Sequence, residues 1–366
     1  MTSRTVRRRA LLGGTLAVAA TARLAGAATA APSRPRPGVA GLLTLVTATP
    51  VVALNEGVHH LQDTWDFLTA AMFHPGFRAV DAIVIELGNA RHQNLADDYV
   101  TGGLVRKSEL RRIWRDTTQS PAATGDIPVI FRLLSLARTI NLFAPRGRPL
   151  RVLLADPPID WTQIRSPADH DRFLMRRNDS WAEVITGEVL AKGRRCVTIG
   201  GGPHFFRNLP FLGFSPPGAP TPPDSPSVSE LIEESHPGTV SVVHTHALVA
   251  SGQITEVETL VAGWARPSIA ATRHTPYGQL PAATILGDLP PEIAQRLAGL
   301  TVADLADQVL YLGPRRALAS AVADWEMFFE PTYWAELTRR TTITGYLGDV
   351  DQLRHETDPA MFPQDR

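Results

Sequence analysis

The sequence contains one cysteine, Cys196, among 366 residues. A single cysteine excludes an intrachain disulfide and a zinc site built from several thiolates. Cys196 stands in the run R-R-C-V-T-I-G, which we interpret as a core strand. We therefore interpret its thiol as a small buried side chain.

An excess of charge of either sign is also missing. Lys plus Arg and Asp plus Glu both number 36, whereas nucleic-acid-binding proteins usually carry a basic excess. The chain has no G-x-S-x-G elbow, no P-loop and no helix-borne H-E-x-x-H pair. These absences argue against a nucleic-acid partner, a serine hydrolase, a nucleotide-binding P-loop protein and a zincin protease. We expect a small-molecule substrate.

No apolar run is long enough for a stable membrane span. Residues 1–31 combine Arg7–Arg9, an Ala/Leu/Gly-rich stretch and small residues before Ala31, which predicts an export signal. Arg8–Leu12 fits the twin-arginine pattern, with an ordinary secretory signal as the alternative. We expect export to the periplasm, cell envelope or extracellular space, without a membrane anchor after signal cleavage.

The rest of the chain alternates short apolar runs with helical patterns. This alternation predicts an α/β fold, a mostly parallel central sheet flanked by helices. We expect a Pro-rich leader over 32–40, a single α/β domain over 41–350 with a helical insertion between core strands at about 95–192, and a tail over 351–366. The predicted core strands are Val51–Leu54, Ala82–Ile85, Arg151–Ala155, Cys196–Ile199, Thr239–Val243 and Val309–Leu312.

Polar residues follow five of these strands. They are Glu56, His59 and His60 after the first, Glu86, Arg91 and His92 after the second, Asp156 and Asp160 after the third, His204 after the fourth, and His244 and His246 after the fifth. A parallel sheet brings its carboxyl ends to one crevice, where ligands bind. The first two strands are joined by a helix, so we expect them to be neighbours with their polar ends side by side.

The residue types suit activation of water. An imidazole accepts a proton near neutral pH when a carboxylate orients it, as Glu86 or Glu56 would orient His59. His204, on a Gly-rich turn, suits stabilisation of developing negative charge. A zinc, manganese or iron site is the alternative, since His59, His60, Glu56, Asp156 and His204 are competent ligands. We favour a site without a metal.

Four motifs resemble the erythromycin esterase/ChaN-like (Tiki) superfamily. They are N-E-G-V-H-H at Asn55–His60, V-I-E-L-G-N-A-R-H-Q at Val84–Gln93, D-D-Y-V-T-G-G at Asp97–Gly103, and G-G-G-P-H-F at Gly200–Phe205. The superfamily shares an α/β core: erythromycin esterases hydrolyse a macrolide lactone without a metal, ChaN-like proteins bind haem, and Tiki proteins are metal-dependent proteases. The resemblance implies functional roles for Glu56, His59, Glu86 and His204.

The leading hypothesis is an exported, metal-independent hydrolase of an ester, lactone or related bond. His59 would be the general base, Glu86 its orienting partner, Glu56 a water-binding carboxylate and His204 an electrophilic group. The residues predicted to contact substrate or to support these four are His60, Arg91, His92, Asp156, Asp160 and His246. The alternatives are a haem- or metal-binding protein without catalysis, a metal-dependent hydrolase, and an inactive relative, because Asn55 stands where the family has glycine.

Overall fold

The computed structural model describes residues 34–57, 61–119, 128–143, 147–209, 225–247, 249–273, 275–286, 294–295, 297–319, 321 and 330–345. The chain divides into two units, Met1–Ala31 and Pro32–Arg366, and every described residue belongs to the second. The predicted export signal and the predicted tail lie outside the described residues. None of the described helices combines the length and apolar character that a membrane span requires.

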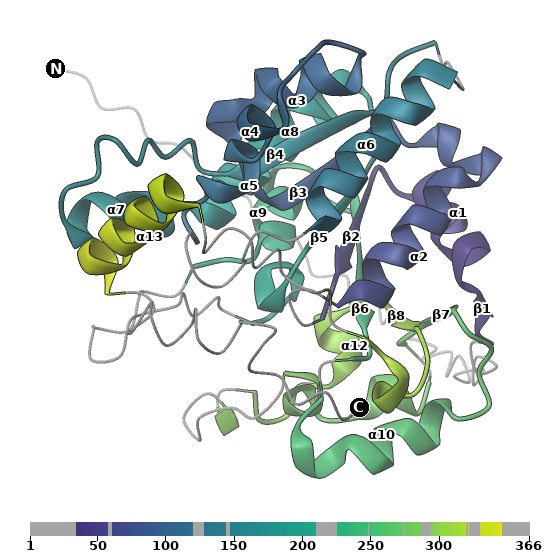
Figure 1. Ribbon diagram of the computed structural model, residues 1–366. Coiled ribbons are helices and arrows are strands. Elements are labelled where there is room, and N and C mark those ends of the chain that lie inside the picture. Colours follow the sequence, from purple (N-terminus) through teal and green to yellow (C-terminus); the bar gives the residue numbers. More distant parts are fainter. Residues whose placement is uncertain are drawn as a thin grey trace, which may run out of the picture. The chain divides into compact units, whose positions relative to one another are not determined.

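An eight-stranded sheet with the order β1-β7-β8-β6-β2-β5-β3-β4 forms the centre of the second unit (Figure 1). Six strands run parallel: β2 (Val51–Asn55), β3 (Ala82–Asn89), β4 (Arg151–Asp156), β5 (Cys196–Gly200), β6 (Val240–Thr245) and β8 (Gln308–Tyr311). At one edge, β7 (Ser268–Ala271) pairs antiparallel with β8, and β1 (Arg36–Pro37) pairs antiparallel with β7. The prediction of an α/β fold with a mostly parallel sheet is confirmed.

Helices cover both faces of the sheet, because its strands are buried on both faces and present alternate residues to each. Val52 and Leu54 of β2 belong to one hydrophobic core, and Val51 and Ala53 belong to the other. The first core includes α1 (Gly38–Ala48), α2 (Gln62–Phe73), α3 (Gln93–Val100), α4 (Lys107–Leu110), α5 (Arg112–Arg115) and α6 (Pro128–Phe143). The second includes α8 (Arg177–Glu188), α9 (Val228–Ser235), α10 (Ile254–Val261) and α12 (Val302–Leu305). Two further helices are α7 (Pro167–Leu174) and α13 (Pro331–Thr344).

The order of the strands corrects one expectation. The strands predicted to be neighbours, β2 and β3, are parallel, but β5 lies between them and pairs with both. The chain returns to the middle of the sheet after β4, and sequence alternation does not reveal such a return. As a consequence, the Gly-rich end of β5 separates Glu56 from Glu86.

Candidate functional site

Glu86 is the centre of a buried polar group at the carboxyl edge of the sheet. The side chain is 2% exposed, and its Oε1 accepts hydrogen bonds from Gln119 Nε2 at 2.9 Å and from Arg177. Oε2 accepts a 2.6 Å hydrogen bond from the backbone N–H of Gly201. The Nε2 atom of His204 lies 3.4 Å from Oε1. Glu86, Asp156, Arg177 and His204 are called the ion cluster below.

The glycine at the end of β5 makes this approach possible. A Cβ atom on Gly200 would lie 2.1 Å from Cη2 of Trp181 and 2.6 Å from Oε2 of Glu86. Both separations are far below van der Waals contact. Only glycine at this position therefore lets the Glu86 carboxylate reach the backbone of the next residue.

Arg177 lies between two buried carboxylates. It is the first residue of α8 and is 3% exposed, and besides pairing with Glu86 it places Nε 3.6 Å from Asp156 Oδ1. Asp156, at the end of β4, accepts hydrogen bonds from the N–H and the hydroxyl of Thr118 at 2.7 and 2.5 Å. Burial raises the pKa of the Asp156 carboxyl to about 7, although Arg177 and Thr118 oppose the shift. The Asp156 carboxyl therefore titrates near neutral pH.

His204 is held by an amide on its far side. Its Nδ1 lies 2.6 Å from Oδ1 of Asn178, whose Nδ2 donates to the carbonyl oxygen of Pro226 at 2.8 Å. The hydrogen bond to Pro226 fixes which end of the Asn178 amide is the oxygen. His204 Nδ1 therefore carries the proton and donates a hydrogen bond to Asn178 Oδ1. A protonated His204 then donates from both nitrogens, to Asn178 and towards Glu86. The ring also lies near Trp181, with 5.6 Å between ring centroids.

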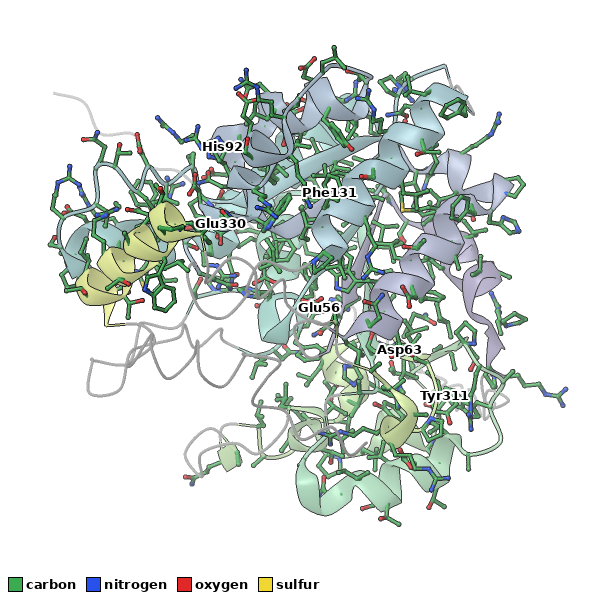
Figure 2. The ribbon with its side chains drawn as sticks, viewed as in Figure 1. Glu56, Asp63, His92, Phe131, Tyr311 and Glu330 are labelled. Atoms are coloured by element: carbon green, nitrogen blue, oxygen red, sulfur yellow. The ribbon has the colours of Figure 1, made fainter. Side chains whose placement is uncertain are left out.

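Glu56 directly follows β2, the strand that pairs with the opposite side of β5 from β3. It is 1% exposed, its Oε2 accepts a 2.9 Å hydrogen bond from Trp65 Nε1, and its backbone N–H donates to Gly200 O. Figure 2 labels Glu56, which follows β2 directly. The Oδ1 atom of Asn55 accepts a 2.8 Å hydrogen bond from Gly57 N, an Asx turn that glycine at that position cannot form. Asn55 thus stabilises the turn through a side chain that the family's glycine lacks.

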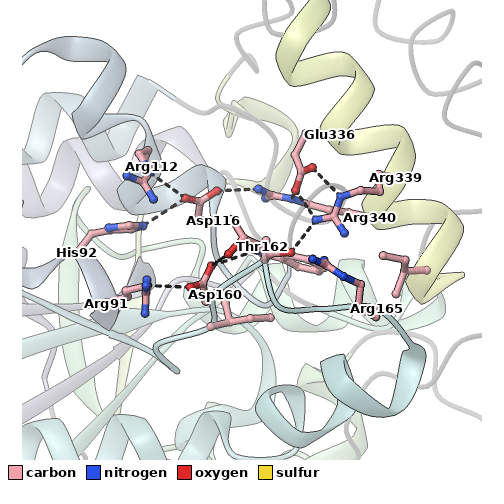
Figure 3. Close-up of a pocket in the computed structure, with 13 residues that line it drawn as sticks. Arg91, His92, Arg112, Asp116, Asp160, Thr162, Arg165, Glu336, Arg339 and Arg340 are labelled. Atoms are coloured by element: carbon pink, nitrogen blue, oxygen red, sulfur yellow. Dashed lines mark hydrogen bonds and ion pairs between the residues drawn. The ribbon is translucent and has the colours of Figure 1, made fainter.

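Two predicted residues, His59 and His60, lie outside the described residues. Three others, Arg91, His92 and Asp160, are not in contact with Glu86 in any described interaction. They line a separate cavity of about 740 Å³, in which Arg91 pairs with Asp160 at 2.8 Å and His92 with Asp116 at 3.2 Å (Figure 3). His246 follows β6, and its ring packs against Tyr311 with 4.7 Å between centroids.

The sequence interpretation missed Thr118, Gln119, Arg177 and Asn178. For the last two a signal exists. Arg177 and Asn178 precede Trp181 by four and three residues on one helix, so helical spacing places them on the same buried face as Trp181. For Thr118 and Gln119 the sequence offers no such signal, because their partners are more than thirty residues away in the chain.

The carboxylate oxygens of the ion cluster can be tested as ligands for the metal ion of the alternative hypothesis. Within the described ranges, no three His, Cys, Asp or Glu side chains are grouped as metal ligands. The oxygens of Glu86 and Asp156 accept N–H or O–H hydrogen bonds, and both carboxylates face Arg177. A guanidinium at this distance opposes a cation, so these two residues do not fit a metal site.

No protein-family model matches the chain, and no curated protein matches it. Solved structures do, each covering 77% of this chain and 94% of the other. A succinoglycan biosynthesis protein matches with 6% sequence identity and a TM-score of 0.51. The erythromycin esterase EreC, solved as a mutant in an open conformation, matches with 9% identity and a TM-score of 0.48. A protein from Bacillus cereus matches with 9% identity and a TM-score of 0.46. The likeness to the succinoglycan biosynthesis protein is one of fold, and it agrees with the α/β architecture that the motifs implied.

Proposed function

We propose that this protein is a metal-independent hydrolase in which an activated water attacks an ester, lactone or related bond. The observation that carries the proposal is the buried contact between Glu86 and His204 at the carboxyl edge of the sheet. A carboxylate beside an imidazole stabilises the charged ring, which can then donate a hydrogen bond to the oxygen that becomes negative during hydrolysis. The fold and the four sequence motifs agree with this class of reaction.

The proposed reaction follows from the chemistry of these groups. His59, the general base proposed from the sequence, takes a proton from water, and the water oxygen bonds to the carbonyl carbon. The carbon–oxygen bond to the leaving group then breaks, and the alkoxide receives the proton. Negative charge develops on the carbonyl oxygen in between, and a hydrogen-bond donor at that position lowers the barrier.

His204 is the donor that we assign to this step. Its 3.4 Å separation from Glu86 Oε1 exceeds the 2.6 and 2.9 Å separations from Gly201 N and Gln119 Nε2. In the doubly protonated ring, the hydrogen bond from Nε2–H to Glu86 is therefore weak and can be exchanged for the substrate oxygen, while the bond from Nδ1–H to Asn178 holds the ring in place. In this proposal Glu86 supplies the fixed negative charge and Glu56 helps to bind the water.

Hydrolysis of a panel of p-nitrophenyl esters and lactones tests the proposal, with and without a chelator. We expect chelator-resistant turnover, its loss in His59→Ala, and a decrease of at least about 100-fold in kcat/KM for His204→Ala and Glu86→Gln. The control is His74→Ala, which removes an exposed histidine at the end of α2. Wild-type rates in His59→Ala or in His204→Ala would refute the assignment. Loss of all turnover on chelation would favour the metal-dependent alternative.

We also propose export by the twin-arginine route. The basis is the Arg8-Arg9-Ala10-Leu11-Leu12 pattern and the mildly apolar stretch after it. Replacing Arg8 and Arg9 together by lysine should retain the precursor in the cytoplasm, as fractionation and immunoblotting would show. An equal exported fraction in wild type and variant would instead indicate an ordinary secretory signal.

A further inference from the structure

The separate cavity of about 740 Å³ carries an excess of positive charge. Among the described residues, its walls hold five arginines, Arg91, Arg112, Arg165, Arg339 and Arg340, and three carboxylates, Asp116, Asp160 and Glu336. The net charge of these eight side chains is +2. They come from four places in the chain: the turn after β3, the segment at α5, the loop after β4, and α13 (Figure 3).

The three carboxylates are already engaged with arginines. Asp116 pairs with Arg340 at 2.7 Å and with Arg112 at 3.3 Å, and Asp160 pairs with Arg91 at 2.8 Å. Glu336 accepts from Arg339 and Arg340 at 2.7 and 2.8 Å. Burial raises the pKa of Asp116, but hydrogen bonds from His92 and Arg340 outweigh it and bring the pKa to about 2. The carboxylates stay ionised near neutral pH, so the positive excess persists there.

Arg165 provides the unneutralised charge. Its side chain is exposed and donates to the backbone oxygen of Ile164 at 3.2 Å, and it forms no ion pair with any residue that the structure describes. The ion pairs around it hold the neighbouring guanidinium groups in fixed orientations. Planar guanidinium groups held in this way match the oxygens of phosphate and carboxylate groups.

We propose that this cavity binds a small organic molecule that carries a doubly charged oxyanion group, a phosphate monoester or a dicarboxylate. The charge of −2 balances the arginine excess. The volume falls in the range of small-molecule sites and greatly exceeds the size of inorganic phosphate. Ile159 and Ile343 supply apolar wall for the rest of the ligand. The cavity opens beside the loop after β4, at the sheet edge where ligands bind in α/β folds.

Calorimetric titration of the full chain at low salt tests the proposal, with inorganic phosphate, phenyl phosphate and phthalate as probes. We expect saturable binding of one molecule per chain, tighter for phenyl phosphate or phthalate than for inorganic phosphate, and weaker as salt screens the arginines. A preference for phenyl phosphate would identify a phosphate monoester, and a preference for phthalate a dicarboxylate. Absence of saturable binding for all three probes would overturn the proposal.

Two substitutions with opposite expected signs identify the site. Arg165→Gln should weaken binding at least about tenfold, because it removes a charged donor. Asp160→Asn should strengthen binding, because it releases Arg91 and retains the side-chain oxygen that accepts from Thr162. Arg172→Gln is the matched control: Arg172 is 73% exposed, pairs with Asp169 and is outside the cavity. Binding that Arg165→Gln and Asp160→Asn leave unchanged, or that they change in the same direction, would place the ligand elsewhere.

Discussion

Two groups of buried polar residues lie at the carboxyl edge of the same sheet and differ in charge. At β3, β4 and β5 the ion cluster holds two carboxylates around Arg177. At the end of β6, His244 and His246 lie among aromatic rings, His244 with Nε2 3.1 Å from the Tyr277 hydroxyl and His246 against Tyr311. Burial lowers the pKa of His244 to about 3 and of His246 to about 4, so both are neutral near neutral pH.

The difference shows what decides whether a buried strand end stays charged. Both groups are shielded from water, which disfavours any isolated charge. In the ion cluster, Arg177 from a separate helix and the backbone N–H of Gly201 compensate Glu86 for its lost hydration, whereas burial still raises the pKa of Asp156 to about 7. The histidines after β6 have aromatic neighbours instead. The identity of the residues at the strand end is therefore less informative than what the rest of the fold places beside them.

The largest expected effect comes from removing the central cation of the ion cluster. Arg177→Met leaves the buried Glu86 carboxylate without its guanidinium partner, so we expect the free energy of unfolding to fall by about 3–5 kcal/mol. Urea denaturation measures it. The matched control is Arg176→Met, the preceding residue, which is 58% exposed and should change stability by less than about 0.5 kcal/mol. Equal effects of the two substitutions would show that Arg177 does not compensate the carboxylates.

The second prediction concerns the pH dependence of Asp156. Its pKa is higher in the folded protein, about 7, than the ordinary value of 3.8, so between these values the folded state binds more protons than the unfolded state. The contribution to stability is complete below pH 3.8 and is lost as the pH rises through 7, with an upper limit of about 4 kcal/mol. Asp156→Asn should abolish this decrease when unfolding is measured from pH 4 to 8. An unchanged slope in the variant would assign the titration to another group.

His244, in β6, and His246, directly after it, should give stability the opposite dependence on pH. The pKa of His244 is lower in the folded protein, about 3, than the ordinary 6.5, so the unfolded state binds the extra proton. Stability is then lost as the pH falls below 6.5, by about 3 kcal/mol at pH 4. His244→Gln should reduce the slope of this acid limb of the unfolding profile, and the contribution of His246 should remain. If His244→Gln unfolds with the wild-type acid profile, the contrast between the two groups fails.

A smaller effect should follow from adding one methyl group at the end of β5. Gly200→Ala forces Trp181 or Glu86 to move, which we expect to cost about 2 kcal/mol and to lower the turnover of the proposed hydrolysis. Gly187→Ala is the control, and we expect it to raise stability where Gly200→Ala lowers it. Its Cβ atom would meet nothing within 4 Å and it lies inside α8, so alanine should stabilise the protein by about 0.5–1 kcal/mol.

Much of the fold could be predicted from the sequence. The apolar runs at Val51–Leu54, Ala82–Ile85 and Cys196–Ile199 are strands. Short apolar runs rich in β-branched residues and bounded by polar residues are typical of buried strands. Two strands, β1 and β7, were missed. They contain only two and four residues and lie at the antiparallel edge, where no long apolar run is needed.

The sequence by itself placed Glu86, Asp156 and His204 near the carboxyl ends of parallel strands, although Glu86 lies within β3 (Ala82–Asn89) and not after it. Only the tertiary structure decided that β5 separates β2 from β3, that Arg177 and Gln119 reach Glu86, and that Arg91, His92 and Asp160 line a different cavity. The physical reason is that periodicity and strand-end chemistry are local, whereas the compensation of a buried charge depends on partners far away in the chain.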